Sequence, residues 1–336
     1  MKTYEISSTT GIEALSLVER PDPTPGCGQV LIRVRATSLN YRDLVIVQGA
    51  YGPNQKLPLI PMSDGAGEVV ALGDGVTRFK VGDRVAGIFF QDWIEGMLTA
   101  AKMESALGGA IDGLLTEYAV LHEDGLVLLP EHLSYEAGAT LPCAAVTAWQ
   151  ALVTKGNITA GETVLILGTG GVSIFALQFA RIHGAHTIVI SSSDAKLEQA
   201  KVLGATNTIN YKTNPDWEKA AYKLTDRQGV DHVVEVGGAG TLAKSLRAVR
   251  VGGKVSLIGI LSGAEGEVNP LPVIMKGLNL QGIYVGSREM FEAMNRAIAL
   301  HQLQPVIDRV FPFTEAPAAY RHLQSAAHLG KIVITV

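Results

Sequence analysis

Hydrophobic and polar positions follow two different rhythms along the 336 residues of the chain. Up to about residue 125, short segments alternate apolar and polar side chains, and QVLIRVRATSL at 29–39 is the clearest of them. This alternation is typical of half-buried antiparallel strands. Dense turn sequences separate the segments, such as PDPTPGCG at 21–28 and VGDRV at 81–85. Segment 91–116 has no clear period, so we expect a long excursion or lid between strands there.

From about residue 160, short continuous apolar runs alternate with helical segments. VLIL at 164–167 precedes a helical pattern that stops at Gly184. HTIVI at 186–190 precedes a second helix, with Ser193 as its N-cap and Gly204 after its last turn. Continuous apolar strands between helices predict a parallel sheet that is covered on both faces. The other predicted elements are strands TNTINY (206–211), VDHVVEV (230–236), KVSLIGI (254–260), LNLQGIYV (278–285) and KIVITV (331–336), and helices at 289–302 and near 315–325.

Length, charge and cysteine content narrow the class of protein. The length suggests two domains. Lys and Arg number 28 against 32 Asp and Glu, without a block of five like charges, so nucleic acid and membrane surfaces are not expected partners. Cys27 and Cys143 are the only cysteines, which excludes a four-thiolate zinc site. The N-terminus has no apolar leader, and the uncharged stretches 137–154 and 163–180 contain Pro or Gly. We therefore expect a soluble, cytoplasmic protein.

A glycine-rich turn after VLIL carries the first functional signal. Glycine makes up 37 of the 336 residues, and GTGGVS at 168–173 places several of them between a predicted strand and a predicted helix. Two glycines of the dinucleotide fingerprint fall in place, and Ser173 takes the third position. Such a turn brings backbone N–H groups and a helix N-terminus to a pyrophosphate. The residues expected at the pyrophosphate are Gly168, Gly170, Gly171 and Val172.

The end of the second strand favours NADP as the cofactor. An NAD site places Asp or Glu there, whereas this chain has serines at 191–193. Asp194 comes later, at the start of a helix, where capping is its expected role. Lys196 can pair with a 2′-phosphate as a point charge, and Tyr211 can donate a hydrogen bond to it. The residues expected to select NADP are Ser191, Ser192, Lys196 and Tyr211.

The motifs taken together resemble the zinc-independent, quinone-oxidoreductase-like and alcohol-dehydrogenase-like branch of the medium-chain dehydrogenase/reductase family. They extend over nearly the whole chain: NYRDL (40–44), SDGAGEVVALG (63–73), FKVGDRV (79–85), LPCAAVTAW (141–149), LGTGGVSIFALQFA (167–180), SSSDAKLEQAKVLGA (191–205) and GKIVI (330–334). The resemblance implies an α/β fold with two domains. A GroES-like β-rich catalytic domain would comprise residues 1–140 and 288–336, and a Rossmann domain with a doubly wound parallel sheet would comprise 141–287.

The resemblance also implies an oligomer and a location for the nicotinamide. A homodimer would form by pairing of the last Rossmann strands, around Leu280–Gly286. The nicotinamide would lie in the cleft between the domains. The further residues implied at the cofactor are Asn40, Thr147, Gly237, Gly259, Val285 and Ser287.

The chain departs from the zinc-dependent members of this family at the metal ligands. Asn40 stands at the first Cys position, Tyr41 follows it, and Ser63-Asp64 replaces the His-Glu pair. Cys143 alone matches the last thiolate ligand. Because a zinc site needs three good protein ligands, we expect no metal in this protein. Cys143 itself is then a small hydrophobic side chain facing the cleft, at a position open to thiol reagents.

Without a Lewis acid, a conjugated acceptor is easier to reduce than an isolated ketone, because it spreads the charge that hydride brings. Candidate catalytic groups are Asn40 and Tyr41 as hydrogen-bond donors, and Asp64 as a titrating group. Each has an alternative role: Asn40 can orient the carboxamide of the cofactor, and Asp64 fits a plain SDG turn. Asp43 is expected to cap a helix or to support the site indirectly.

An aromatic group supplies a candidate wall for a hydrophobic substrate, although core packing explains such residues equally well. The residues of this candidate pocket are Tyr51, Phe89, Phe90, Trp93 and Cys143. The sequence therefore predicts an NADPH-dependent reductase of a small hydrophobic quinone or α,β-unsaturated carbonyl compound. Two alternatives remain, a zinc-independent alcohol dehydrogenase or carbonyl reductase, and a non-catalytic, crystallin-like NADPH-binding protein.

Overall fold

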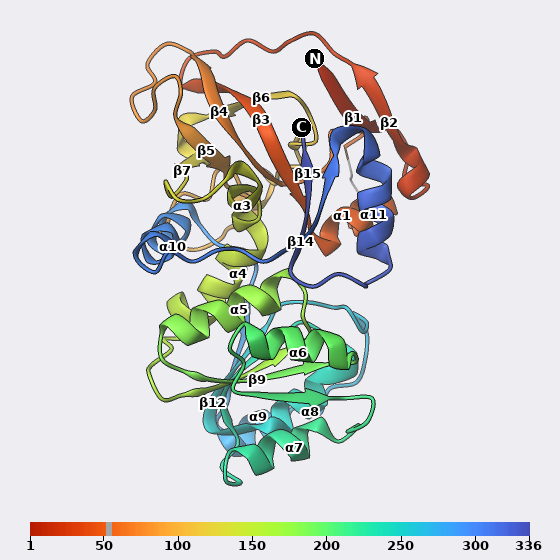
Figure 1. The fold of residues 1–336 in the computed structure, drawn as a ribbon, viewed down its shortest axis with the longest axis vertical. Helices are drawn as coiled ribbons and strands as arrows, with labels where there is room; N and C mark the ends of the chain where they lie inside the picture. Colours follow the sequence, from red (N-terminus) through yellow and green to blue (C-terminus); the bar gives the residue numbers. More distant parts are fainter. Residues whose placement is uncertain (52–55) are drawn as a thin grey trace. The chain divides into compact units, whose positions relative to one another are not determined.

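The computed structural model describes residues 1–51 and 56–336, which divide into two compact units. Unit 1 comprises Met1–Val146 and Val285–Val336, and unit 2 comprises Thr147–Tyr284. Both ends of the chain lie in unit 1 (Figure 1). The expected domain boundaries, 140/141 and 287/288, lie within a few residues of these.

Unit 1 is built on a seven-stranded sheet in the order β14-β15-β3-β4-β5-β7, with β6 also paired to β3. The alternating segment 29–39 forms β3, and every pairing of β3 is antiparallel, as its pattern predicted. The closing strand β15 pairs with β3, so that Ile332 lies opposite Leu39. Pairing of the tail with β3 explains why residues so distant in sequence share one unit. The strands are β3 (Gln29–Leu39), β4 (Asp64–Leu72), β5 (Arg84–Gly87), β6 (Tyr118–His122), β7 (Leu126–Leu128), β14 (Ile307–Pro312) and β15 (Lys331–Thr335), beside a separate hairpin of β1 (Lys2–Ile6) and β2 (Leu15–Glu19).

Helices α1 (Tyr41–Val47) and α11 (Ala316–Gln324) bury apolar faces in a core of unit 1 that they share with β15. Tyr320 on α11 is the largest fully buried side chain of the described residues. Segment 91–116 is mostly irregular, as expected, and contains only the short helix α2 (Ala100–Met103) among its named elements. Burial of α1 fixes the residues that precede and begin it, Asn40 to Asp43.

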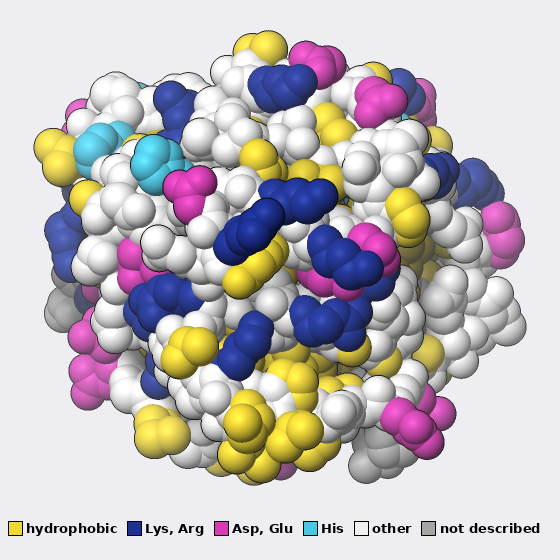
Figure 2. All heavy atoms as spheres, turned by 90° about the horizontal axis from the view of Figure 1, so that it is seen from below, with side chains coloured by type: hydrophobic (Ala, Val, Ile, Leu, Met, Phe, Trp, Pro, Cys, Tyr) yellow, Lys and Arg dark blue, Asp and Glu magenta, His cyan; other side chains and the backbone are white. Residues whose placement is uncertain are grey.

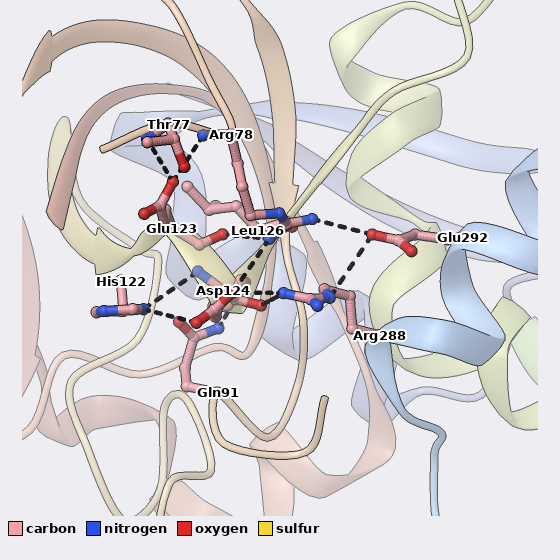
Figure 3. Close-up of polar contacts among 10 residues, drawn as sticks. Thr77, Arg78, Gln91, His122, Glu123, Asp124, Leu126, Arg288 and Glu292 are labelled. Carbon is pink, nitrogen blue, oxygen red and sulfur yellow. Dashed lines mark hydrogen bonds and ion pairs between the residues drawn. The ribbon is translucent and has the colours of Figure 1, made fainter. Parts of the chain in front are cut away.

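An ion-pair network ties α10 (Arg288–Leu300) to the turn before β7 within unit 1 (Figure 3). Arg288 donates to the Asp124 carboxylate at 2.7 Å, and Arg78 donates to Glu292 at 3.0 Å. Arg78 also donates to the carbonyls of Glu123 and Leu126. The backbone N–H of Arg288 donates to the carbonyl of Trp93, so the same helix end holds the start of the irregular segment.

The uncharged stretch near 137–154 forms a helical connection with an unusual pattern of backbone hydrogen bonds. After α3 (Tyr135–Ala139), two π-helical turns, Leu141–Ala145 and Gln150–Thr154, flank the short helix α4 (Val146–Trp149). π-helical turns are rare and concentrate at functional sites. Across the described residues, each helix is too short or too polar to span a lipid bilayer.

Unit 2 contains a six-stranded sheet in the order β10-β9-β8-β11-β12-β13, and all of its pairings are parallel. Figure 1 shows α5 and α6 on one side of this sheet and α8 and α9 on the other. The parallel sheet covered on both faces that the apolar runs predicted is thus confirmed, and so is the doubly wound Rossmann domain that the resemblance implied. Its elements are β8 (Thr163–Leu167), α5 (Gly171–Ile182), β9 (His186–Ser191), α6 (Asp194–Val202), β10 (Asn207–Asn210), α7 (Trp217–Leu224), β11 (Val230–Glu235), α8 (Ala239–Ala248), β12 (Val249–Leu257), α9 (Leu271–Lys276) and β13 (Asn279–Gly282).

Candidate active site

The glycine turn of unit 2 leaves open space at the start of α5. Gly168 has φ +74°, a conformation that side chains beyond Gly rarely adopt. Gly170 is the N-cap of α5, and a Cβ added there would meet nothing within 4 Å. Ser173 donates to the carbonyl of Leu167 at 2.7 Å and so holds the turn against its strand. The first N–H groups of α5 lack helical partners, and together with this space they suit an anionic group.

The adjacent strand ends bring the residues predicted to select the cofactor near one another. The backbone N–H of Tyr211 donates to the carbonyl of Ser191 at 3.1 Å, which places the end of β10 beside the end of β9. The Ser193 side chain accepts from the N–H of Lys196, so it is the N-cap of α6 that the sequence predicted. The Asp194 carboxylate accepts from Asn210 at 2.7 Å, on the first turn of the helix.

A buried carboxylate that the sequence did not single out organises the turn at Gly237. Glu235 is fully buried at the end of β11 and accepts from the N–H groups of Gly237 at 2.7 Å and Gly238 at 3.1 Å. It also accepts from the hydroxyl of Thr241 at 2.6 Å. A Cβ at Gly259 would come within 2.4 Å of the carbonyl of Val236, so glycine there allows the two loops to pack. A Cβ at Gly237 would come within 2.2 Å of the Thr241 hydroxyl, so close packing favours glycine at both predicted cofactor positions.

In unit 1, a cluster of buried charges surrounds Asn40. Lys331 has 2% of its surface exposed, and its ammonium donates to Asn40 Oδ1 and, at 2.7 Å, to the carbonyl of Leu39. The same ammonium lies 3.5 Å from Asp64 Oδ2. Asp43 Oδ2 accepts from the backbone N–H of Asn40 at 2.8 Å. This contact is part of the capping box of α1, so the capping role expected of Asp43 is confirmed. Asn40 Nδ2 is buried and has no hydrogen-bond partner in residues 1–51 and 56–336.

Burial dominates the titration of two groups in this cluster. Desolvation raises the pKa of Asp43 to about 6, although Arg42 and the Asn40 N–H oppose the shift. Burial, with the nearby Asp64 charge, also raises the pKa of the Cys143 thiol. In the metal-free chain the thiol form of Cys143 therefore dominates at neutral pH, and this form is a poor nucleophile.

Arg42 and Asp64 complete the polar lining of the cluster. The Arg42 guanidinium donates to the carbonyl of Leu107 at 2.8 Å, lies 3.5 Å from Asp43, and stacks near the rings of Tyr51 and Phe89. Asp64 is fully buried and accepts from the hydroxyl of Ser63 at 2.9 Å. Asp64 thus belongs to a charge network and is more than a plain turn residue.

Three of the candidate substrate aromatics, Phe89, Phe90 and Trp93, form a buried cluster against which the partly buried Cys143 packs, whereas Tyr51 packs against the core that contains α1 and α11. Phe89 and Phe90 have 1% of their surfaces exposed and Trp93 has 2%, and the ring centroids of Phe89 and Phe90 lie 4.7 Å apart, edge to face. Val285 joins the same cluster in a backbone conformation with φ +55°, which is an outlier for a β-branched residue. These rings are core residues of unit 1 in this structure, and a role as a substrate wall stays a prediction.

Three further predicted site residues differ from one another in exposure and in structural role. Tyr41 exposes 47% of its surface at the first position of α1. Thr147 is buried in the α4 helix. Ser287 is fully buried and accepts from the N–H of Met290 as the N-cap of α10, so its hydroxyl has a capping role.

Sequence reasoning missed Lys331 and Glu235 because charged side chains are normally exposed. The available signal was their position beside apolar residues within predicted strands, KIVITV and VDHVVEV. Within the part of the chain that the structure describes, no group of three or more His, Cys, Asp or Glu side chains is arranged to hold a metal ion.

Comparison with known proteins places these two units among dehydrogenases. The family model described as alcohol dehydrogenase GroES-like domain matches residues 26–131, and the one described as zinc-binding dehydrogenase matches residues 171–299. A zinc-type alcohol dehydrogenase-like protein of Schizosaccharomyces pombe is 46% identical over 316 residues, which cover 92% of this chain and 91% of the relative. A quinone oxidoreductase of Sus scrofa is 30% identical, with 93% and 90% covered. A crystal structure assigned as an alcohol dehydrogenase from Sinorhizobium meliloti is 42% identical, with TM-score 0.93 and 99% and 98% covered.

Proposed function

The chain belongs to the medium-chain dehydrogenase/reductase family, and from this premise we propose that it is an NADPH-dependent reductase of small hydrophobic quinones or α,β-unsaturated carbonyl compounds that works without zinc. Members of the family bind a nicotinamide cofactor and are oxidoreductases. The observation that carries the proposal is the cluster around Asn40, where an amide and a buried ammonium stand among the positions of the metal ligands.

The donor set around Asn40 does not suit zinc. The amide oxygen of Asn40 already accepts from Lys331, and the hydroxyl of Ser63 is held by Asp64. Cys143 supplies the single thiol among the positions of the metal ligands. A cation at Lys331 Nζ, 3.5 Å from Asp64 Oδ2, also balances the one carboxylate that a metal would need. Zinc needs deprotonated or neutral lone-pair donors, and this cluster supplies too few of them.

The glycine turn fits the pyrophosphate of a dinucleotide, and the serines at 191–193 fit NADP. Gly170 faces open space, so a phosphate can approach the backbone N–H groups of α5 closely. Ser191, Ser192 and Tyr211 lie at or just after the ends of β9 and β10, and Lys196 lies in the first turn of α6. An acidic side chain that would repel a 2′-phosphate is missing from positions 191–193.

The chemistry available to unit 1 is hydrogen-bond donation. When bound, the reduced nicotinamide supplies hydride from C4 to an electrophilic carbon of the acceptor, which then takes up a proton. Charge develops on the acceptor oxygen, and the chain must stabilise it without a Lewis acid. An enone or quinone delocalises that charge, so one amide donor such as Asn40 Nδ2 is enough to stabilise what remains on the oxygen. An isolated ketone would develop a full alkoxide, which needs a stronger partner.

A single substrate screen tests the proposal. NADPH consumption is followed at fixed enzyme concentration with quinones, enones, aldehydes and simple ketones, after metal analysis of the purified chain. We expect turnover with quinones or enones and far less than one zinc per chain. Turnover with simple ketones alone would support the alcohol dehydrogenase alternative, and no turnover with any acceptor would support an NADPH-binding protein without catalysis. Near-stoichiometric zinc would refute the zinc-free mechanism.

We also propose that the protein forms a homodimer through unit 2. Strand β13 is the edge of the six-stranded sheet, and its open backbone can pair with a second copy. Apolar side chains of α9 beside it are well exposed, with 72% of Ile274 and 74% of Met275 accessible. Figure 2 shows apolar side chains gathered on the face seen from below. Light scattering should give the mass of two chains, and a charged residue at Ile274 should shift it towards one.

A further inference from the structure

The amide of Asn40 is held with its oxygen against a cation while its nitrogen remains unpaired. Lys331 Nζ donates to Asn40 Oδ1. Because an ammonium carries donors only, it determines which end of the amide is the oxygen. Asn40 Nδ2 is then a buried donor, and the described residues offer it no acceptor. Leaving such a donor unpaired costs stability, so a partner beyond the described residues is expected, and a bound ligand can supply it.

The ammonium of Lys331 is itself fully engaged. Its three hydrogens face three oxygen atoms, those of the Leu39 carbonyl, the Asn40 amide and the Asp64 carboxylate. A substrate oxygen would therefore have to displace one of these partners to reach Lys331. The cation acts on the reaction through the group that it holds, and it polarises the Asn40 amide so that Nδ2 becomes a stronger donor.

We propose that Lys331 is a positioning residue that holds the Asn40 amide so that Nδ2 donates to the carbonyl oxygen of the acceptor. This inference rests on the proposed reductase function and assigns the donor within it. The backbone of Asn40 is fixed from its other side, where its N–H donates to Asp43. The antiparallel pairing of Ile332 with Leu39 brings Lys331 to the same place from the far end of the chain. Asp64 neutralises the buried cation, and the acceptor oxygen consequently meets a neutral, oriented amide.

Four variants test the coupling between the two residues in the full chain. Asn40→Ala and Lys331→Met should each lower kcat/KM for the acceptor by about 100-fold, the effect of removing one oxyanion donor. The double variant should be no worse than Asn40→Ala, because both changes remove the same hydrogen bond. Lys331→Arg, which keeps charge and donors, should recover part of the loss. The dissociation constant for NADPH separates the two roles considered for Asn40: if Nδ2 donates to the acceptor, the loss in kcat/KM should far exceed any loss of NADPH affinity. A loss of NADPH affinity as large as the loss in kcat/KM would assign Nδ2 to the carboxamide of the cofactor and overturn the proposal. Losses that multiply in the double variant would overturn the proposal.

A charge-balanced variant separates positioning from folding. Lys331→Met leaves Asp64 buried without its cation, so its melting temperature is expected to fall. Lys331→Met combined with Asp64→Asn removes both charges and should recover most of the melting temperature while the catalytic loss persists. Recovery of activity in this combination would show that charge balance, and not orientation of Asn40, is what Lys331 provides.

A spectroscopic readout keeps this inference separate from the proposed function. In protein labelled with ¹⁵N at asparagine, the side-chain amide resonances of Asn40 are identified by their loss in Asn40→Ala. They should move in Lys331→Met and remain near their original positions in Lys331→Arg. If wild-type protein reduces no acceptor, the proposed function fails, and the resonances still report whether Lys331 holds the amide. Unmoved resonances in Lys331→Met would overturn the inference.

Discussion

The ammonium of Lys331 lies 3.5 Å from Asp64 Oδ2, and both side chains are almost fully enclosed in unit 1. Desolvation of two charges is expensive, so the pair is tolerable only while both members are present. The pair joins β15 to β4 on either side of β3. Loss of one member therefore affects stability far more than loss of an exposed pair on the same strand.

Asp64→Asn should lower the free energy of unfolding by about 3–5 kcal/mol, because it leaves the buried Lys331 cation uncompensated. Urea denaturation measures the change. Glu68→Gln is the matched control on β4, since Glu68 pairs with Arg35 at 2.9 Å with a third of each side chain exposed. The control should cost less than about 1 kcal/mol. Equal effects of the two substitutions would contradict the burial argument.

Gly170→Ala should weaken NADPH binding at least tenfold with little change in stability. The new Cβ meets nothing within 4 Å in the protein, and Gly170 has an ordinary φ of −76°. It would, however, occupy the space in which we place the pyrophosphate. Fluorescence titration with NADPH and thermal unfolding measure the two effects. Gly168→Ala offers the contrast, because φ +74° makes that substitution cost about 1–2 kcal/mol of stability as well. Unchanged NADPH affinity in Gly170→Ala would place the cofactor elsewhere.

His232 should make the protein less stable in mild acid. Its ring lies in the sheet of unit 2, 3.0 Å from the hydroxyl of Ser256, and burial lowers its pKa from 6.5 to about 4. Between these pH values the unfolded chain binds a proton that the folded chain does not. The stability that neutral His232 contributes is therefore complete above pH 6.5. As the pH falls towards 4 this contribution is lost, which lowers the free energy of unfolding by about 3 kcal/mol in total.

His232→Gln should abolish this part of the pH dependence. Urea unfolding of both proteins at several pH values between 4 and 7 gives the difference, in which the carboxylates cancel because both proteins contain them. Asp43 has the opposite sign, since its pKa rises to about 6 on folding and it favours the folded state as the pH falls. Parallel pH profiles of the two proteins would contradict the assignment to His232.

The two thiols should differ strongly in reactivity. Cys27 is exposed, whereas Cys143 is partly buried and desolvation of its sulfur raises its pKa. The thiolate is the reactive form, so a disulfide reagent at neutral pH should modify one cysteine per native chain rapidly and the second only after unfolding. Mass spectrometry of the labelled peptides identifies the site. Rapid labelling of Cys143 would show that the sequence-based expectation of a thiol open to reagents was right and that the burial argument is wrong.

Sequence patterns of short range were sufficient for much of the fold. The alternation in 29–39 predicted β3, and the apolar runs with Ser193 as a cap predicted the strands and helices of unit 2. Helical turns with π spacing in 141–154 were not predicted, because the residues there have no period that distinguishes a π ladder from an α ladder. Burial of Phe89, Phe90 and Trp93 was left open for a similar reason, since an aromatic residue suits a core and a pocket equally.

The amino-acid sequence alone determined the features that depend on neighbours along the chain: the glycine turn between β8 and α5, the serines at the end of β9, and the side chains of Asn40 and Ser63, on which the expectation of a zinc-free site rests. Only the tertiary structure revealed that Lys331 and Glu235 are buried and what they hold. A charge is tolerated inside a protein only when several partners surround it at once. For Lys331 those partners lie between 267 and 292 residues earlier in the chain, at Leu39, Asn40 and Asp64, so no local pattern can predict them.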